Sequence, residues 1–364
     1  NAYHQFTVGR HLLEAAAHAS RLVDRVSRPD LLVLGALFHD IGKGLPGDHT
    51  EVCMDLLRAI GPKLGLGAAD VDVLVALVEH HLLLPDVAVR RDLADPATIE
   101  AVADAVGSVE VLELLHALTE ADSLATGPSA WGDWKEELVA ELVARVRHVL
   151  GGGDVAEVTW RLFPDATTLE RMAGGDTDIS REGDVITVVN TDAAGTFSRI
   201  AGVLSLHGLD VVSAQAHSDE GGMAASRFRI VVPEAGLNWR SVKGDLVKAL
   251  DRQLAIEARL AERASTYRRR RRLQAALPGP PSVVFDDEAS SNATVIVVRA
   301  ASKVGILHRI SKALGELGLD IRHATVQTMG MEIVDTFYVR ANGSLVTDAA
   351  YRKEIQRAVL HAIA

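Results

Sequence analysis

Apolar positions follow a helical spacing along the first 150 residues. Leucine, valine and alanine recur every three or four positions, which is the period of a helix that buries one face. In the segment 7–26, the apolar stripe consists of Leu12, Ala16, Ala19, Val23 and Val26. Three glycines at 151–153 end the pattern. The spacing therefore predicts an all-α domain over residues 1–150.

Residues that cap helices mark the expected boundaries within this domain. A side-chain oxygen at a helix start accepts backbone N–H groups, and glycine suits a left-handed residue after a helix end. The predicted boundaries are a second helix running up to Gly42, a capping box of Asp48 and Glu51 for the third, a helix from Asp70 through Leu84 that Pro85 stops, and further starts at Asp95 and Ser108.

From about residue 184, β-branched strands alternate with short helices, and the chain repeats itself at an offset of 110 residues. The aligned pairs are Gly195 with Gly305, Arg199 with Arg309, Ile200 with Ile310, Leu204 with Leu314, and Gly208-Leu209-Asp210 with Gly318-Leu319-Asp320. Each copy reads as a strand, a glycine turn, a helix, two strands and a second helix. This order predicts two α+β, ferredoxin-like domains of the βαββαβ kind.

The expected organisation is thus a multidomain chain. Residues 1–150 form the helical domain, 151–182 a connector, 183–275 the first α+β domain, 276–291 a linker, and 292–364 the second α+β domain. Because position 1 is Asn and no secretory leader follows, we expect the chain to be part of a longer protein.

Composition excludes some partners. A net charge of −11 and an aromatic content of 4% disfavour nucleic acid, and we expect the run YRRRRR at 267–272 to be a solvated linker. The longest apolar runs, such as LLVLGALF at 31–38, are far shorter than the roughly 20 residues that span a membrane. Cys53, the only cysteine, is expected in the core, which fits a reducing cytoplasm.

Histidines and aspartates in the helical half are candidate metal ligands. They are His11, His39, Asp40, His49, His80, His81 and Asp122. Imidazole and carboxylate together hold divalent cations, which polarise phosphoryl oxygens during ester hydrolysis. Each candidate lies on a helix or at a helix end, so several helices can direct them to one cavity. Mn²⁺ or Mg²⁺ suits this set better than a structural zinc, which more often recruits cysteine.

Taken singly, each candidate also has an ordinary explanation. His4 or His18 fits the pattern as well as His11, and His49 beside the proposed cap is compatible with a surface position. Asp40 differs, because a carboxylate near a helix C-terminus is disfavoured by the dipole and calls for a compensating cation. Burying His80, His81 or Asp122 without partners would be costly, so the joint pattern favours a metal site.

In the order His11, then His39-Asp40 within FHDIGKG, then Asp122, the chain resembles the HD superfamily of metal-dependent phosphohydrolases. The resemblance implies a helical fold and a primary metal site made by these four residues. It also implies that His49, His80 and His81 add a second ion or contact phosphate. Asp40, Lys43 and His80 are the expected catalytic residues. Lys43 is placed to contact a substrate phosphate, although a lysine also suits a helix C-terminus.

The segments NTDAAGTFSRI and RAASKVGILHRI resemble the ligand-binding loop of ACT domains, which sense amino acids. The resemblance implies effector binding near Asp192 and Gly195 in the first copy and near Ser302 and Gly305 in the second. Ser302 replaces the usual acidic residue, so the second copy departs from the pattern. The alternative is a pair that serves only as an interaction module.

A helical HD domain, the segment GPSAWGDWKEEL and two ACT domains together resemble part of the bifunctional uridylyltransferase/uridylyl-removing enzyme family. We find no Gly-Ser motif followed by paired aspartates, the mark of its nucleotidyltransferase domain. The resemblance implies removal of UMP or AMP from a PII nitrogen-signalling protein, with glutamine as effector. Two alternatives remain: an HD hydrolase of a small nucleotide such as an alarmone, and a non-catalytic amino-acid sensor.

Overall fold

The computed structural model describes residues 7–127, 130–158, 163–233, 236–270, 279–329 and 332–364. The chain divides into two compact units, residues 1–160 and 161–364, and each is described by itself. His4 and residues 271–272 of the arginine run lie outside the described residues.

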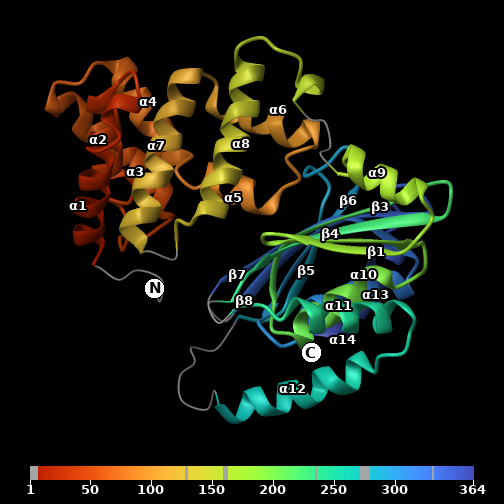
Figure 1. The fold of residues 1–364 in the computed structure, drawn as a ribbon. Helices are drawn as coiled ribbons and strands as arrows, with labels where there is room; N and C mark the ends of the chain where they lie inside the picture. Colours follow the sequence, from red (N-terminus) through yellow and green to blue (C-terminus); the bar gives the residue numbers. More distant parts are fainter. Residues whose placement is uncertain (1–6, 128–129, 159–162, 234–235, 271–278, 330–331) are drawn as a thin grey trace. The chain divides into compact units, whose positions relative to one another are not determined.

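The first unit is helical, as the apolar spacing predicts (Figure 1). Its α-helices are α1 (Val8–Ala19), α2 (Pro29–Phe38), α3 (His49–Ile60), α4 (Ala68–Glu79), α5 (Leu83–Arg90), α6 (Pro96–Val106), α7 (Val109–Thr126) and α8 (Asp133–Leu150). Helix α7 contacts α1, α2, α4, α5, α6 and α8. Its side chains Leu112, Leu114, Leu115 and Leu118 are fully buried. The core of the unit therefore surrounds α7.

Three predicted helix starts are confirmed. Asp48 accepts hydrogen bonds from the backbone N–H groups of Thr50 and Glu51, and Asp95 and Ser108 cap α6 and α7 in the same way. The predicted start at Asp70 is wrong, because α4 begins at Ala68 and the Asp70 carboxylate accepts a hydrogen bond from Arg28. The same helix ends at Glu79, not Leu84.

The prediction that Pro85 stops a helix is also wrong. Pro85 lies in the first turn of α5, where the N–H group that proline lacks would have no helical partner in any case. A turn at residues 80–82 separates α4 from α5. This turn carries the two adjacent histidines.

Gly42 is not a left-handed helix cap. Helix α2 already ends at Phe38, with His39 as its C-cap. A Cβ at Gly42 would lie 2.9 Å from a Val52 methyl and 3.0 Å from the backbone nitrogen of Cys53. Glycine is therefore needed because the turn after α2 packs directly on α3. Cys53 is fully buried there, as expected, and its Sγ accepts the Gly42 N–H.

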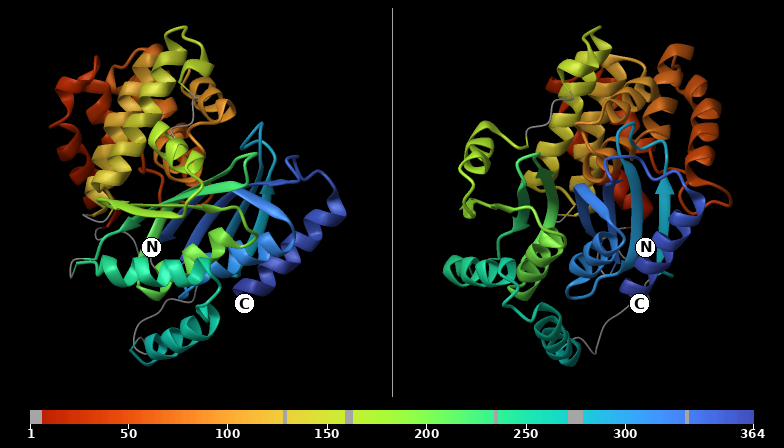
Figure 2. Two further views of the ribbon diagram at one scale, coloured as in Figure 1. Left: turned by 45° about the vertical axis from the view of Figure 1, so that its right-hand side comes forward. Right: turned by 90° about the vertical axis from the view of Figure 1, so that its right-hand side faces the viewer.

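The second unit is one antiparallel sheet of eight strands in the order β1-β2-β4-β3-β7-β8-β6-β5. The strands are β1 (Asp178–Glu182), β2 (Val185–Thr191), β3 (Asp210–Ser218), β4 (Met223–Val231), β5 (Ser282–Asp286), β6 (Thr294–Ala301), β7 (Leu319–Met329) and β8 (Glu332–Ala341). The helices are α9 (Ala166–Ala173), α10 (Thr196–Leu206), α11 (Trp239–Leu250), α12 (Ile256–Arg270), α13 (Ile306–Glu316) and α14 (Ala349–Ile363). Figure 2 shows α10, α11, α13 and α14 on one face of the sheet. Helix α9 packs against β2 and β4, where Met172 joins Val189 and Met223 in a separate cluster. An antiparallel sheet with a layer of four helices is consistent with the predicted tandem ACT domains.

The two copies join through equivalent strands. In the β3–β7 pair, Ala214 lies opposite Ala324, and these residues are related by the same 110-residue offset as the sequence repeat. Ser213 and Gln215 on either side pair with Thr325 and His323. The copies therefore form a pseudo-twofold pair, with its axis passing between Ala214 and Ala324.

The strand order differs from the predicted βαββαβ order. The outer strand of each copy, β1 or β5, precedes the copy's first long strand in an antiparallel hairpin instead of following its second helix. The expected connector 151–182 thus contains α9 and β1, and the expected linker 276–291 contains β5. These five-residue edge strands lie outside the aligned repeat, so its periodicity did not reveal them.

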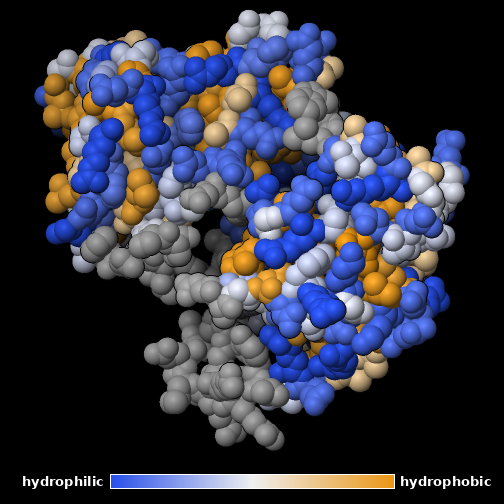
Figure 3. All heavy atoms as spheres, viewed as in Figure 1, coloured by the Kyte–Doolittle hydropathy of each residue, from blue (hydrophilic) through white to orange (hydrophobic). Residues whose placement is uncertain are grey.

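No helix among the described residues is long and apolar enough to cross a membrane. On the face drawn in Figure 3, apolar residues (orange) form separate patches among hydrophilic ones (blue).

Candidate metal centre

Five structural elements of the helical unit supply the predicted ligands. His11 comes from α1, His39 and Asp40 from the turn after α2, His49 from the first position of α3, His81 from the turn after α4, and Asp122 from α7. His11, His39, Asp40 and His81 are buried. Asp48 caps α3 one residue before His49, so this cap fixes where the histidine begins its helix.

The side chains converge at two groups that share Asp40. In one group His11, His39 and Asp40 each place a ligand atom within 4.8 Å of the others, and in the second Asp40, His49 and His81 do the same. The Nε2 atoms of His11 and His39 are 3.3 Å apart. Asp122 Oδ1 lies 3.0 Å from His11 Nε2 and 3.4 Å from His39 Nε2. Asp122 therefore contacts both histidines of the first group.

Backbone carbonyls fix the orientation of two imidazoles. Nδ1 of His39 lies 3.0 Å from the carbonyl oxygen of Ala36, and Nδ1 of His81 lies 2.7 Å from that of Val78. Since a carbonyl only accepts, Nδ1 carries the proton in each pair. In the neutral rings the Nε2 lone pairs are then left for a metal ion, which is the usual outer arrangement of metal-binding histidines.

Asp40 has one oxygen paired and one available. Its Oδ2 accepts a hydrogen bond from Lys43 Nζ at 2.6 Å, which is the compensating cation that its position near a helix C-terminus calls for. Its Oδ1 is buried and has no hydrogen-bond donor among the described residues. Burial raises the pKa of Asp40, but the charges of His39 and Lys43 outweigh burial and lower it. Asp40 is thus an ionised candidate ligand whose Oδ1 has no hydrogen-bond donor among the described residues.

The neighbouring groups shift each other's protonation. Burial opposes ionisation of Asp122, but hydrogen bonds with His11 and His39 hold the pKa of Asp122 far below its ordinary value. Burial likewise opposes protonation of His39, and Asp122 and Asp40 raise its pKa nonetheless. The pKa of His81 is lowered by burial and by the charge of His39. The shifts therefore keep the Asp40 and Asp122 carboxylates in the ionised form that can bind a cation.

These donors fit a divalent cation. A buried oxygen without a donor, fixed imidazole lone pairs and two ionised carboxylates are oxygen and nitrogen ligands of the kind that hold divalent cations. The buried Cys53 thiol belongs to neither ligand group among the described residues. The donor set thus resembles a carboxylate-containing catalytic site more than a structural zinc site.

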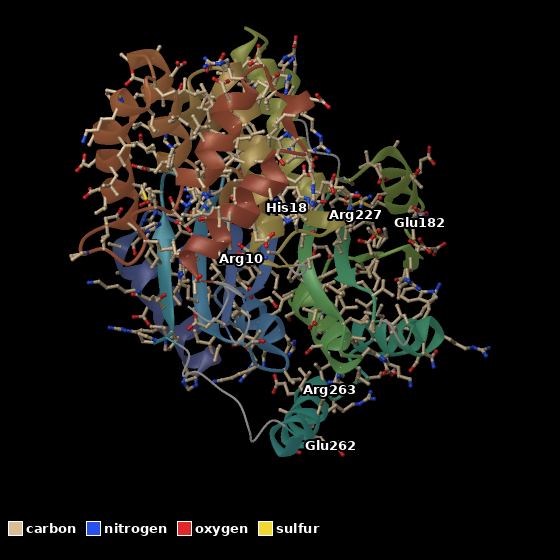
Figure 4. The ribbon with its side chains drawn as sticks, turned by 90° about the vertical axis from the view of Figure 1, so that its left-hand side faces the viewer. Arg10, His18, Glu182, Arg227, Glu262 and Arg263 are labelled. Atoms are coloured by element: carbon tan, nitrogen blue, oxygen red, sulfur yellow. The ribbon has the colours of Figure 1, made fainter. Side chains whose placement is uncertain are left out.

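Two of the predicted catalytic residues, His80 and Lys43, lie outside the two ligand groups. His80 is half-buried and belongs to neither ligand group, whereas its neighbour His81 belongs to one. His18, an alternative to His11 on α1, is also in neither group (Figure 4). The pairing of Lys43 with Asp40 places its ammonium at the edge of the cluster. The assignments of His80 and Lys43 to catalysis stay predictions.

One residue near the centre was not predicted. Lys135, in the first turn of α8, donates to Ser123 Oγ at 3.3 Å and to the Ala130 carbonyl at 3.0 Å. Burial lowers its pKa, although the nearby Asp122 acts in the opposite direction. The only signal in the sequence was its position within GPSAWGDWKEEL, which does not distinguish it from a surface lysine.

The predicted effector loops lie where the sequence suggests, between a strand and a helix. Gly195 and Gly305 precede α10 and α13 with φ of 79° and 75°, a left-handed conformation that favours glycine. Ser302 and Gly305 line a groove of about 1200 Å³. Asp192 and Gly195 are not among the residues that line it.

Comparison with known proteins identifies the family of the helical unit and the relatives of the chain. The profile of the HD domain family matches residues 8–126. A Streptomyces coelicolor protein named bifunctional uridylyltransferase/uridylyl-removing enzyme is 40% identical over 391 residues, covering 93% of this chain and 46% of the relative. Proteins of the same name from Mycobacterium tuberculosis H37Rv and Gluconobacter oxydans are 40% and 33% identical, covering 97% and 99% of this chain and 45% of each relative. The chain spans about half the length of these curated relatives. Residues 8–126 are therefore an HD domain, and nearly the whole chain is homologous to part of the bifunctional uridylyltransferase/uridylyl-removing enzymes.

Proposed function

We propose that the helical unit is a metal-dependent phosphodiesterase that removes a nucleotidyl group, UMP or AMP, from a PII nitrogen-signalling protein. The observation that carries the proposal is the sharing of one buried carboxylate, Asp40, by two groups of candidate ligands within an HD domain. Asp40 can hold one ion or bridge two. Relatives whose names include uridylyl-removing activity support the choice of substrate class.

The ligands divide between two positions around Asp40. His11, His39 and Asp122 would hold the primary ion with Asp40, and His49 and His81 would hold a second ion or contact the phosphate. Mn²⁺ or Mg²⁺ at these positions would polarise the phosphoryl oxygens of the substrate. His49 is the most accessible of the set, with 37% of its side chain exposed, and so lies where substrate can enter.

The chain's own groups position and neutralise the substrate. Lys43 holds its ammonium on Asp40, where it can also contact a phosphate oxygen and offset charge that develops during attack. The carbonyl contacts of His39 and His81 keep both rings in one orientation. Hydrolysis forms a bond between water oxygen and phosphorus and breaks the ester bond to PII. The products are a nucleoside monophosphate and the unmodified protein hydroxyl.

Regulation by glutamine belongs to the same proposal. Ser302 and Gly305 line a groove in the sheet-and-helix unit, which supports effector binding there. We expect bound glutamine to favour removal of the nucleotide. A lone buried cysteine fits a reducing compartment, so we place this activity in the cytoplasm.

The direct test is release of nucleotide from modified PII by this chain with added Mn²⁺ or Mg²⁺. We expect release that stops when the metal is chelated, with modified PII hydrolysed in preference to free nucleotides. Preferred hydrolysis of a free alarmone would favour the small-nucleotide alternative. Tight glutamine binding with neither metal binding nor hydrolysis would favour a non-catalytic sensor.

A further inference from the structure

The groove in the sheet-and-helix unit is built by both copies of the repeat. The first copy contributes the end of α10, the start of β3 and α12, and the second contributes residues 302–309 and the end of α14. Helix α12, on which Figure 4 labels Glu262 and Arg263, follows the last aligned helix of the first copy. Its Leu260 packs against the loop at Gly305 and so closes one side of the groove.

Arg309 lines this groove without a partner. Its guanidinium has no hydrogen bond or ion pair with any described residue, and burial lowers its pKa. Other arginines in the unit do find acceptors, for example Arg352, which pairs with Asp287. A partly desolvated guanidinium with open donors binds carboxylates well, because two parallel N–H groups match the two oxygens.

Arg199, the equivalent arginine of the first copy, forms hydrogen bonds with its own loop. Arg199 Nη2 donates to the Ala194 carbonyl at 3.1 Å and lies 3.4 Å from Thr196 Oγ1. Its Nη1 would lie 3.2 Å from a Cβ added at Gly195, so the guanidinium covers its own glycine loop. In the second copy, Ile306 replaces Thr196 and offers no hydroxyl. The second copy therefore lacks one of the two acceptors that hold Arg199 over its loop.

A buried histidine of the groove lacks a donor. His308 is 4% exposed, and its Nδ1 lies 2.7 Å from the carbonyl oxygen of Ser198 in the other copy. Nδ1 therefore carries the proton, and Nε2 is an acceptor with no partner among the described residues. A buried acceptor without a partner costs about 1–3 kcal/mol, which a ligand N–H group can recover.

We propose that the second copy, not the first, is the amino-acid site of this chain, with Arg309 pairing with the ligand carboxylate and His308 accepting an N–H group. The ligand is a free amino acid, and glutamine fits because it has a carboxylate and two N–H-bearing groups. This assignment is opposite to the expectation from Asp192 and Ser302, which favoured effector binding by the first copy. Only the identification of glutamine rests on the proposed function.

The test is calorimetric titration of the whole chain with L-glutamine and with glutamine whose carboxylate is blocked as an amide. Arg309→Met should weaken glutamine binding by at least ~10-fold, the equivalent of about 1.4 kcal/mol. The matched variant Arg199→Met should bind like wild type. The blocked ligand should bind weakly to every variant.

A second variant separates loss of the site from loss of the fold. Ile306→Thr gives Arg309 the hydroxyl that Arg199 already has, so we expect weaker glutamine binding with an unchanged melting temperature. Loss of binding in Arg199→Met, or wild-type binding in Arg309→Met, would overturn the assignment. So would the absence of binding by the wild-type chain to any of the common amino acids. Hydrolysis without effector should be unchanged in Arg199→Met, and glutamine binding is measured without hydrolysis, so failure of the hydrolase proposal would be seen separately.

Discussion

The metal centre and the groove differ in how their polar groups are satisfied. In the metal centre, His11, His39 and Asp122 contact one another, and Asp40 is paired with Lys43, so the chain itself holds the ligands in place. In the groove, Arg309 and the Nε2 of His308 have no partner among the described residues. The proposed catalytic site is therefore largely organised in advance, with Asp40 Oδ1 left for an ion, whereas the proposed amino-acid site would be completed by its ligand.

The largest expected effect comes from removing the shared charge of the metal centre. Asp40→Asn should lower nucleotide release by at least ~100-fold, because even residues that only orient metal ligands contribute 10–100-fold. The change should abolish high-affinity metal binding measured by calorimetry. Asp55→Asn is the control, since Asp55 is a highly exposed residue of the adjacent helix α3. Equal activities of Asp40→Asn and the control would contradict the site.

Adjacent histidines allow a matched comparison within the centre. His81→Ala should weaken metal binding and slow release by roughly 10–100-fold, because it removes a fixed Nε2 ligand. His80→Ala should stay close to wild type in metal affinity, since His80 belongs to neither ligand group. A loss of release in His80→Ala with normal metal affinity would support the predicted catalytic role of His80. A loss of metal affinity in His80→Ala alone would show that the ligand set is misassigned.

Asp335 in the second copy is a buried acid that neither proposal uses. It is fully buried on β8 opposite Val298 and Val326. Burial raises the pKa of Asp335 well above the ordinary value, although the backbone N–H of Gln327 acts in the opposite direction. The folded state therefore keeps its proton to higher pH than the unfolded chain. As pH rises from about 4 towards the raised pKa, this group lowers the free energy of unfolding by up to about 1.4 kcal/mol per pH unit.

Asp335→Asn should remove this fall in the free energy of unfolding with rising pH. We expect the variant's urea midpoint to exceed the wild-type midpoint by an amount that grows with pH, measured by a probe of the sheet-and-helix unit. Asp320→Asn, at a half-exposed aspartate on β7, is the control. Parallel pH profiles of wild type and Asp335→Asn would mean that Asp335 is not a neutral buried acid.

The smallest expected effect concerns the residue that caps the helix of His49. Asp48→Ala removes the acceptor of two backbone N–H groups and should cost about 1 kcal/mol of stability. Metal affinity should fall slightly, because His49 begins the helix that Asp48 caps. Chemical unfolding and metal titration of the same variant measure both effects. A large loss of metal affinity without a loss of stability would make Asp48 a ligand and not a cap.

The sequence predicted the parts of the structure that depend on local pattern. Helical spacing, the caps at Asp48, Asp95 and Ser108, and the strand-turn-helix around Gly195 and Gly305 follow from short-range chemistry. The convergence of His11, His39, Asp40 and Asp122 was expected from the family resemblance. Each of these features has a local signal in the residues themselves.

The features that the sequence did not predict depend on distant contacts. Gly42 was taken for a helix cap because its close approach to Val52 and Cys53 exists only in the folded unit. The edge strands β1 and β5 carry too few alternating residues to stand out from a linker. Arg199 is held by the Ala194 carbonyl and the Thr196 hydroxyl, whereas Arg309 has no such contact, and this difference is visible only in the folded loops.

The most direct test of the central claim is an anomalous difference map from crystals grown with Mn²⁺. The account predicts a peak among Nε2 of His11, Nε2 of His39 and the carboxylates of Asp40 and Asp122, with ligand distances of roughly 2.0–2.3 Å. A second peak beside His49 and His81 would identify a two-ion site. Mn²⁺ bound elsewhere, or no peak at this cluster at saturating Mn²⁺, would contradict the assignment.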